Sequence, residues 1–381
     1  MLTFALILHI YDLTKSLTTI SLVMIASAIP SVIFGPFAGA LSDKVRYKKI
    51  LIYTNILRFL VILILIPFAT NTLAILELIF LLATITQFFA PAELSSLPLI
   101  VNKNQLVGAN SIYMTTMYGA LIFGYGLAGP LQALVGSSWL FFIIAMLYIV
   151  SAGFIWLMSD YDQKEISARL TLTNLAEKII SIWKLTKSGI KYIIGRRNIY
   201  SPMLKLSIGW AMLGAFIVVL PGFAENVINI STKLAGLILI VPAGIGMLIA
   251  SYFLHKKSEI SKTAVINSSF IICGITLFIF SLYSFFESLT FSLLIAIALM
   301  IILGFSAACI YISSQTLLHL NSDEKMRGRV FGIAAMLISL ALSIPALVVG
   351  GIADLTSTVV TLLLVSLTII FYGISLIFDE E

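Results

Sequence analysis

Two charged residues, Arg58 and Glu93, stand inside long apolar stretches of the sequence. Arg58 comes about eleven residues into the apolar run 47–69, roughly 16 Å along a helix. Glu93 lies about seven residues from the end of the run 73–100, roughly 10 Å deep by the same rise. Because an unpaired charge in hydrocarbon is costly, we expect both to face other helices and to contact each other or a polar neighbour. They could form a gate or a proton-linked element, or a static buried ion pair.

Other polar side chains inside apolar runs are suited to a central cavity: Asn55, Gln87 and Gln315. The sequence has no paired His/Glu metal spacing, no Gly-x-Ser-x-Gly elbow and no Gly-x-x-x-x-Gly-Lys-Ser/Thr phosphate loop, and it has only 3 His. We therefore expect no enzyme activity, no metal, no cofactor and no ATP hydrolysis by this chain.

The elements that position these residues are membrane helices. The chain has 381 residues, of which 60% are hydrophobic and 10% charged, and its mean hydropathy is +1.10. A soluble chain carries about 25% charged residues. Eleven apolar runs are long enough to cross a bilayer. They cover 18–41, 47–69, 73–100, 108–133, 138–159, 201–223, 233–254, 261–283, 289–319, 328–351 and 355–378. The sequence predicts an all-α polytopic membrane protein.

The start of the chain is too short to be a twelfth span. Residues 1–10 are apolar, but a bilayer crossing needs about 20 residues. Residues 11–16 are typical of an external turn after a first helix. We expect that most of the first helix is missing and that Met1 is an internal or misassigned start. The alternative is a protein with eleven spans and a stub.

Basic residues fall in alternate connections. Most of the 23 Lys and Arg lie in 44–49, 164–197, 256–262 and 325–329. Short cytoplasmic loops retain Lys and Arg, so these connections and both termini are expected in the cytoplasm, with the protein in the plasma membrane. The net charge of +6 is then a topology signal and not a sign of nucleic-acid binding.

One long polar break divides the chain into three parts: a helical bundle at 1–158, a linker at 159–200 and a second bundle at 201–381. Apolar residues recur at helical spacing within the linker, and lysines fall mostly on the other flank. This pattern predicts an amphipathic helix in the cytoplasmic interface, where cations meet anionic lipid. A plain solvated linker is the alternative.

The connection between the first two full spans carries a motif made of a small residue, an acid and a basic run. Its members are Gly39, Asp43, Lys44, Arg46, Lys48 and Lys49. The stretch resembles the loop between the second and third helices of the major facilitator superfamily, Gly-x-Leu-x-Asp-Arg-x-x-Arg-Arg/Lys. Lys44 replaces the usual Arg, which keeps the charge and removes bidentate pairing.

The resemblance implies two six-helix bundles, here eleven full spans plus a stub of the first. It also implies that Asp43 faces the start of the eleventh helix near Arg327 and Arg329, as a gate on the cytoplasmic side. Gly126, Gly129 and Pro130 resemble a motif associated with exchangers, and Pro345 takes the place of Pro130 in the second half. Glycines permit close helix approach and Pro permits a bend. Packing alone is the alternative.

Finer similarity points to the macrolide-efflux and enterobactin-exporter branch. It rests on the stretches 88–92, 106–110 and 327–332. The resemblance implies a secondary active transporter that exports a small amphipathic molecule by alternating access. We expect coupling to protons, because Glu93 is titratable and the sequence has no nucleotide-binding motif, and we expect a monomer. The alternatives are import of a small metabolite and transport of lysophospholipid. A channel would need a filter segment or a ring of like residues, and neither is evident.

Overall fold

A computed structural model describes residues 1–42, 45–101, 106–158, 187–257, 259–283 and 292–378. In this part of the chain the secondary structure is helical, and the chain forms two compact units. Unit 1 consists of 1–5, 25–124 and 131–184, and unit 2 consists of 6–24, 125–130 and 185–381. The short segments 6–24 and 125–130 therefore pack with helices that come much later in the chain.

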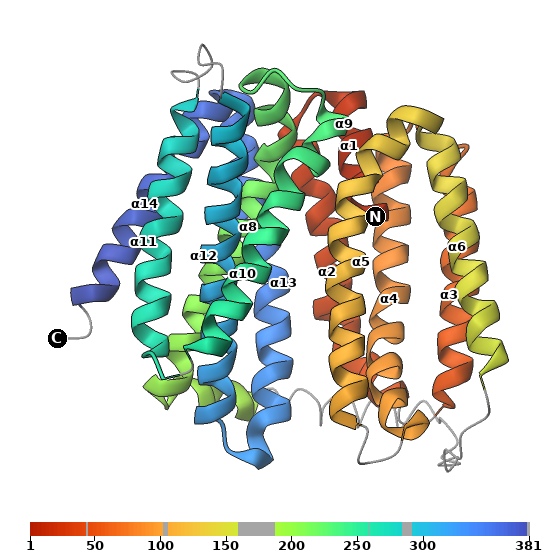
Figure 1. Cartoon of the computed structure of the whole chain (residues 1–381). Helices are drawn as coiled ribbons and strands as arrows, with labels where there is room; N and C mark the ends of the chain where they lie inside the picture. Colours follow the sequence, from red (N-terminus) through yellow and green to blue (C-terminus); the bar gives the residue numbers. More distant parts are fainter. Residues whose placement is uncertain (43–44, 102–105, 159–186, 258, 284–291, 379–381) are drawn as a thin grey trace. The chain divides into compact units, whose positions relative to one another are not determined.

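Unit 1 is built around α3. The helices that contribute to it are α2 (Leu17–Ser42), α3 (Tyr47–Leu65), α4 (Thr72–Ile100), α5 (Leu106–Val135) and α6 (Ser137–Leu157). α3 packs against both α4 and α6 (Figure 1). Asn71 begins α4, because its side chain accepts hydrogen bonds from the backbone N–H groups of Leu73 and Ala74.

Unit 2 contains the second half of the chain. Its long helices are α8 (Arg197–Asn226), α10 (Val241–Lys256), α11 (Lys262–Ser281), α12 (Ser292–Asn321), α13 (Glu324–Leu355) and α14 (Thr358–Phe378). α12 packs against α8, α10 and α11, and α8 also packs against α13. The α1 helix (Leu2–Thr14) places Ile7 and Tyr11 in a buried cluster with Val218 of α8.

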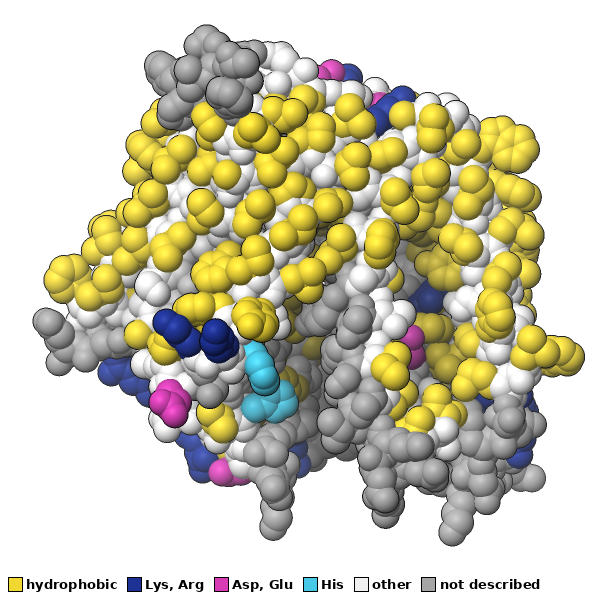
Figure 2. All heavy atoms as spheres, viewed as in Figure 1, with side chains coloured by type: hydrophobic (Ala, Val, Ile, Leu, Met, Phe, Trp, Pro, Cys, Tyr) yellow, Lys and Arg dark blue, Asp and Glu magenta, His cyan; other side chains and the backbone are white. Residues whose placement is uncertain are grey.

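Nine helices among the described residues are long and apolar enough to cross a membrane. Two further helices, α3 and α5, coincide with predicted spans but are not among these nine. α3 has 19 residues and carries Lys48, Lys49 and Arg58, and the described apolar part of α5 begins only at Ile122. Hydrophobic side chains cover the visible faces of the helices, and most visible charged side chains lie near helix ends (Figure 2).

Three boundaries differ from the sequence prediction. α1 continues through Thr14, so the expected turn at 11–16 is reduced to Lys15 and Ser16, with Lys15 at a φ of 51°. α8 begins at Arg197, inside the stretch assigned to the linker. The apolar run 233–254 is not one regular helix, because α9 (Thr232–Ala235) passes through the π-helical segment η2 (Gly236–Ile240) into α10.

Candidate functional site

Arg58 is a buried cation in the middle of α3. Only 6% of its surface is exposed. Its guanidinium lies 4.3 Å from the centre of the Phe89 ring of α4 and 5.5 Å from that of Tyr148 of α6. It donates a long hydrogen bond of 3.5 Å to the Oδ1 atom of Asn55. Cation–π contacts of this kind stabilise a desolvated guanidinium by about 2 kcal/mol or more each, so they offset part of the cost of burial.

A cavity of about 360 Å³ opens beside this cation within unit 1. Its wall is mainly apolar and aromatic, with three polar side chains, and is made by Met1, Leu2, Asn55, Arg58, Phe89, Ile144, Leu147, Tyr148 and Ser151. Asn55 is buried and donates to the Oγ atom of Ser151 over 3.3 Å. The Nε atom of Arg58 has no hydrogen-bond partner in the described structure. Figure 2 shows basic and acidic side chains inside a hollow of unit 1.

Glu93 contacts a tyrosine and not Arg58. Its carboxylate accepts a hydrogen bond of 3.2 Å from the hydroxyl of Tyr113 on α5. Among the described residues, no ion pair joins Glu93 to Arg58. The helices therefore bring each charge to a polar neighbour, which was one of the two arrangements expected from the sequence.

The basic connection before α3 is described only in part. Asp43 and Lys44 lie outside the described residues, and Gly39 lies in the last turns of α2. Arg46 is the N-cap residue of α3, and Lys49 is exposed. The Nζ atom of Lys48 donates 2.6 Å to the carbonyl of Met158, the C-cap residue of α6, and so ties the two helices together.

The other predicted site residues lie in several places. Arg329 is near the start of α13 and donates to the Oγ atom of Ser188, while the side chain of Arg327 lies outside the described part. Gln87 donates to the carbonyl of Ala83 within α4. Gln315 is half-buried on α12.

The small residues of α5 serve close packing. A Cβ atom on Gly129 would overlap the carbonyl of Lys233, so only glycine permits this approach to α9. A Cβ atom on Gly126 would come within 2.7 Å of the Cγ2 atom of Val241. α5 continues through Pro130, and α13 continues through Pro345.

Asp354, at the end of α13, is a functional candidate whose role was not predicted from the sequence. Its carboxylate accepts from the Oγ of Ser16 at 2.6 Å, from the N–H of Leu17 at 2.8 Å and from the N–H of Thr18 at 2.9 Å. Ser16 directly precedes α2, and Leu17 and Thr18 are its first residues, so Asp354 caps a helix that begins more than three hundred residues earlier. The adjacent ion pair of Lys15 with Glu225, 2.8 Å, is exposed and contributes little.

Lys205 is a second overlooked residue. It is buried in α8, and its Nζ atom donates 2.9 Å to the Oδ1 atom of Asn267 on α11. The amide of Asn267 then donates to the carbonyl of Leu376 on α14. A single lysine inside the apolar run 201–223 was the signal that could have identified it.

Buried charges within a set of long apolar helices are typical of a polytopic membrane protein. A family model described as Major Facilitator Superfamily matches residues 1–346. The chain belongs to the major facilitator superfamily. It is accordingly a multi-pass membrane transporter and not an enzyme.

Curated relatives of this major facilitator protein come from Bacillus subtilis (strain 168). The uncharacterized MFS-type transporter YfiS is 24% identical over 369 residues, covering 91% of this chain and 81% of its own length. The uncharacterized MFS-type transporter YjbB is 26% identical over 156 residues, covering 38% of each.

Solved structures confirm the major facilitator fold. The nucleoside transporter NupG has a TM-score of 0.73 with 15% identity, and the comparison covers 99% of this chain and 97% of that chain. A point mutant of NupG gives a TM-score of 0.72 with 16% identity, covering 98% and 94%. At these identities the likeness concerns the fold alone.

Proposed function

We propose that this major facilitator protein is a secondary active transporter that exports a small amphipathic molecule in exchange for protons. The observation that carries the proposal is the cavity of unit 1, in which Arg58 lies among aromatic and aliphatic side chains. An apolar wall with a few placed polar groups suits an amphipathic molecule. A cation kept inside a membrane domain at this cost is a functional candidate by default.

Glu93 is the proposed proton-carrying group. It lies inside the span 72–97, its hydrogen bond to Tyr113 holds the carboxylate in place, and Arg58 lies on the neighbouring helix. A carboxylate that gains and loses a proton during the cycle would change the net charge around Arg58. Each protonation state would then favour a different arrangement of the helices. In the proposed transport cycle, a site near the middle of the membrane opens to one side at a time by alternating access.

The test compares Glu93→Gln with Glu77→Gln in proteoliposomes that carry an imposed pH gradient. Glu77 is an exposed carboxylate on the same helix, so its variant controls for charge loss and membrane insertion. Efflux probes would come from an accumulation screen of amphipathic dyes in an efflux-deficient host. We expect Glu93→Gln to abolish gradient-driven transport with normal insertion, and Glu77→Gln to transport normally. Equal activity of both variants would refute the role of Glu93.

Import of a small metabolite is the second candidate. NupG, a nucleoside transporter, shares the fold of this chain. Uptake of radiolabelled uridine into right-side-out and inverted vesicles separates the two directions. Uptake that is limited to right-side-out vesicles would favour import, whereas dye uptake limited to inverted vesicles would favour export. Lysophospholipid transport would appear in the same assay with a labelled lipid.

A further inference from the structure

The described end of the linker is a helix with two different faces. It spans 187–194, and two residues, Gly195 and Arg196, separate it from α8. On the first face, a Cβ atom on Gly189 would come within 2.7 Å of the Cδ1 atom of Ile333, so the backbone of this helix lies close against the side chains of α13. Ile193 is 4% exposed and belongs to the buried cluster that includes Val330 and Ile333 of α13. This face is therefore packed against protein.

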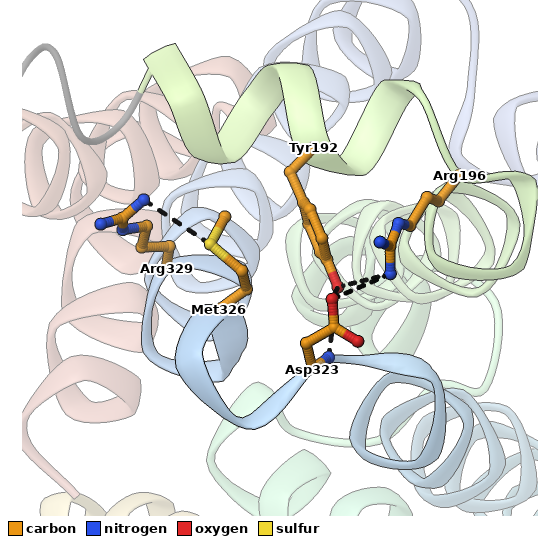
Figure 3. Close-up of polar contacts among 5 residues, drawn as sticks. All are labelled: Tyr192, Arg196, Asp323, Met326 and Arg329. Carbon is orange, nitrogen blue, oxygen red and sulfur yellow. Dashed lines mark hydrogen bonds and ion pairs between the residues drawn. The ribbon is translucent and has the colours of Figure 1, made fainter.

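Polar contacts fasten the same face to the turn before α13. The hydroxyl of Tyr192 donates 2.8 Å to the Oδ2 atom of Asp323, and Arg196 donates to the same oxygen over 3.0 Å. Figure 3 shows Tyr192 and Arg196 pointing together at Asp323. The backbone N–H of Asp323 donates in turn to the Tyr192 hydroxyl over 3.2 Å. The helix is held at both its packed face and its end.

The opposite face is exposed and combines apolar with basic side chains. At about 100° per residue, Lys187, Ile190, Lys191 and Ile194 share one side of the helix. Ile190 is 43% exposed and Ile194 is 66% exposed, and both lysines are exposed. Two exposed isoleucines beside two lysines form the pattern of a helix that lies in a membrane interface.

The location of the helix indicates which surface covers this face. Arg197, the first residue of the membrane span α8, comes three residues after Ile194. The helix therefore lies close to the end of a membrane span, near the level where the bilayer meets water. The isoleucines are suited to the edge of the acyl region and the lysines to phosphate groups above it.

We propose that Lys187, Ile190, Lys191 and Ile194 form a docking surface for anionic phospholipid headgroups. Lipid would bind one face of the helix 187–194, while the other face packs against the start of α13. Ser188 of this helix accepts a hydrogen bond from Arg329 of α13. Anionic lipid thus stabilises the packing of the linker on α13. This inference is independent of the proposed substrate and direction of transport.

The test uses the full chain in nanodiscs that contain increasing fractions of phosphatidylglycerol in phosphatidylcholine. Ile194→Cys carries an environment-sensitive fluorophore, and the two native cysteines are buried. We expect emission at position 194 to shift to that of an apolar setting as the phosphatidylglycerol fraction rises. The combined Lys187→Gln and Lys191→Gln variant should need more anionic lipid, because each lysine near a charged surface changes affinity about fivefold.

The matched control is the combined Lys256→Gln and Lys257→Gln variant, which removes the same charge from another exposed basic connection. We expect its titration to match that of the parent protein. Emission that does not respond to phosphatidylglycerol would overturn the proposal. Equal phosphatidylglycerol midpoints for the two double variants would also overturn it. A cross-link from position 194 to another protein chain, in place of lipid, would do the same.

Discussion

The contact between Asp354 and the start of α2 provides the sharpest test of the structure. Asp354→Asn keeps one acceptor oxygen, which can still receive the N–H of Leu17. The new amide group cannot accept from the Ser16 hydroxyl or from the N–H of Thr18, and the negative charge at the start of α2 is lost. The variant should loosen the start of α2 from the end of α13.

The size of the effect follows from these contacts. Each lost hydrogen bond contributes a net stabilisation of about 0.5–1.5 kcal/mol. Loss of a charge at a helix N-terminus costs about 0.3–1 kcal/mol. Because Asp354 is exposed, values at the low end apply and the total is about 1–2 kcal/mol. The population in which this contact is open should rise roughly five- to thirtyfold.

Thiol labelling measures that population. Met24 is 7% exposed and lies in the buried cluster that α2 forms with Ala346 and Ala353 of α13, so Met24→Cys reacts only when the contact opens. With a membrane-impermeant reagent, the labelling rate should rise by the same factor when Asp354→Asn is added.

A matched carboxylate provides the control. Asp12 lies near the same turn, and within the described part of the chain it accepts a long hydrogen bond of 3.5 Å from the Thr232 hydroxyl. Asp12→Asn should change the labelling rate by less than twofold. Equal acceleration by both substitutions, or none by Asp354→Asn, would show that the cap does not hold the two helices together.

Three further outcomes follow from the structure and the sequence. Cysteine labelling at Lys48 and Lys257 should give the same sidedness, and opposite sidedness would contradict the predicted topology. Gly304→Ala should lower the thermal unfolding midpoint, since its Cβ would overlap the carbonyl of Ala243 and overpacking costs about 1–3 kcal/mol. Gly119→Ala should leave the midpoint unchanged, because there is open space around Gly119. Asp43→Asn should shift the population towards the inward-facing state and alter transport, and cross-linking between positions 43 and 329 measures the shift. Unchanged conformation and transport would mean that Asp43 is only a boundary residue.

The membrane helices could be predicted from the sequence because each apolar run carries its own signal. The runs 73–100 and 355–378 correspond closely to α4 and α14. Hydrocarbon leaves a backbone few options other than a helix, so length and apolarity suffice. The π turn at Gly236–Ile240 was not predictable in this way, because its residues are as apolar as those of a regular helix.

The polar site residues were predictable to different degrees. Arg58 could be identified because a charge inside an apolar run must find a partner, and the structure gives it Asn55 and aromatic rings. Its relation to Glu93 was left open, since sequence spacing does not fix how neighbouring helices are rotated. Asp354 has the appearance of a solvated residue at a helix end. Its role depends on a contact with Leu17, and nothing local in the sequence encodes that contact.

The π-helical segment has a consequence for how this chain aligns with its relatives. Gly129 contacts the carbonyl of Lys233 before the segment, and Gly304 contacts that of Ala243 after it. One residue added to an α-helix rotates everything beyond it by about 100°, which would break one of these backbone contacts. A π turn holds the extra residue locally. Homologous spans that are α-helical throughout would thus carry one residue fewer between the two contacts. A residue inserted into this membrane span would therefore be held within Gly236–Ile240.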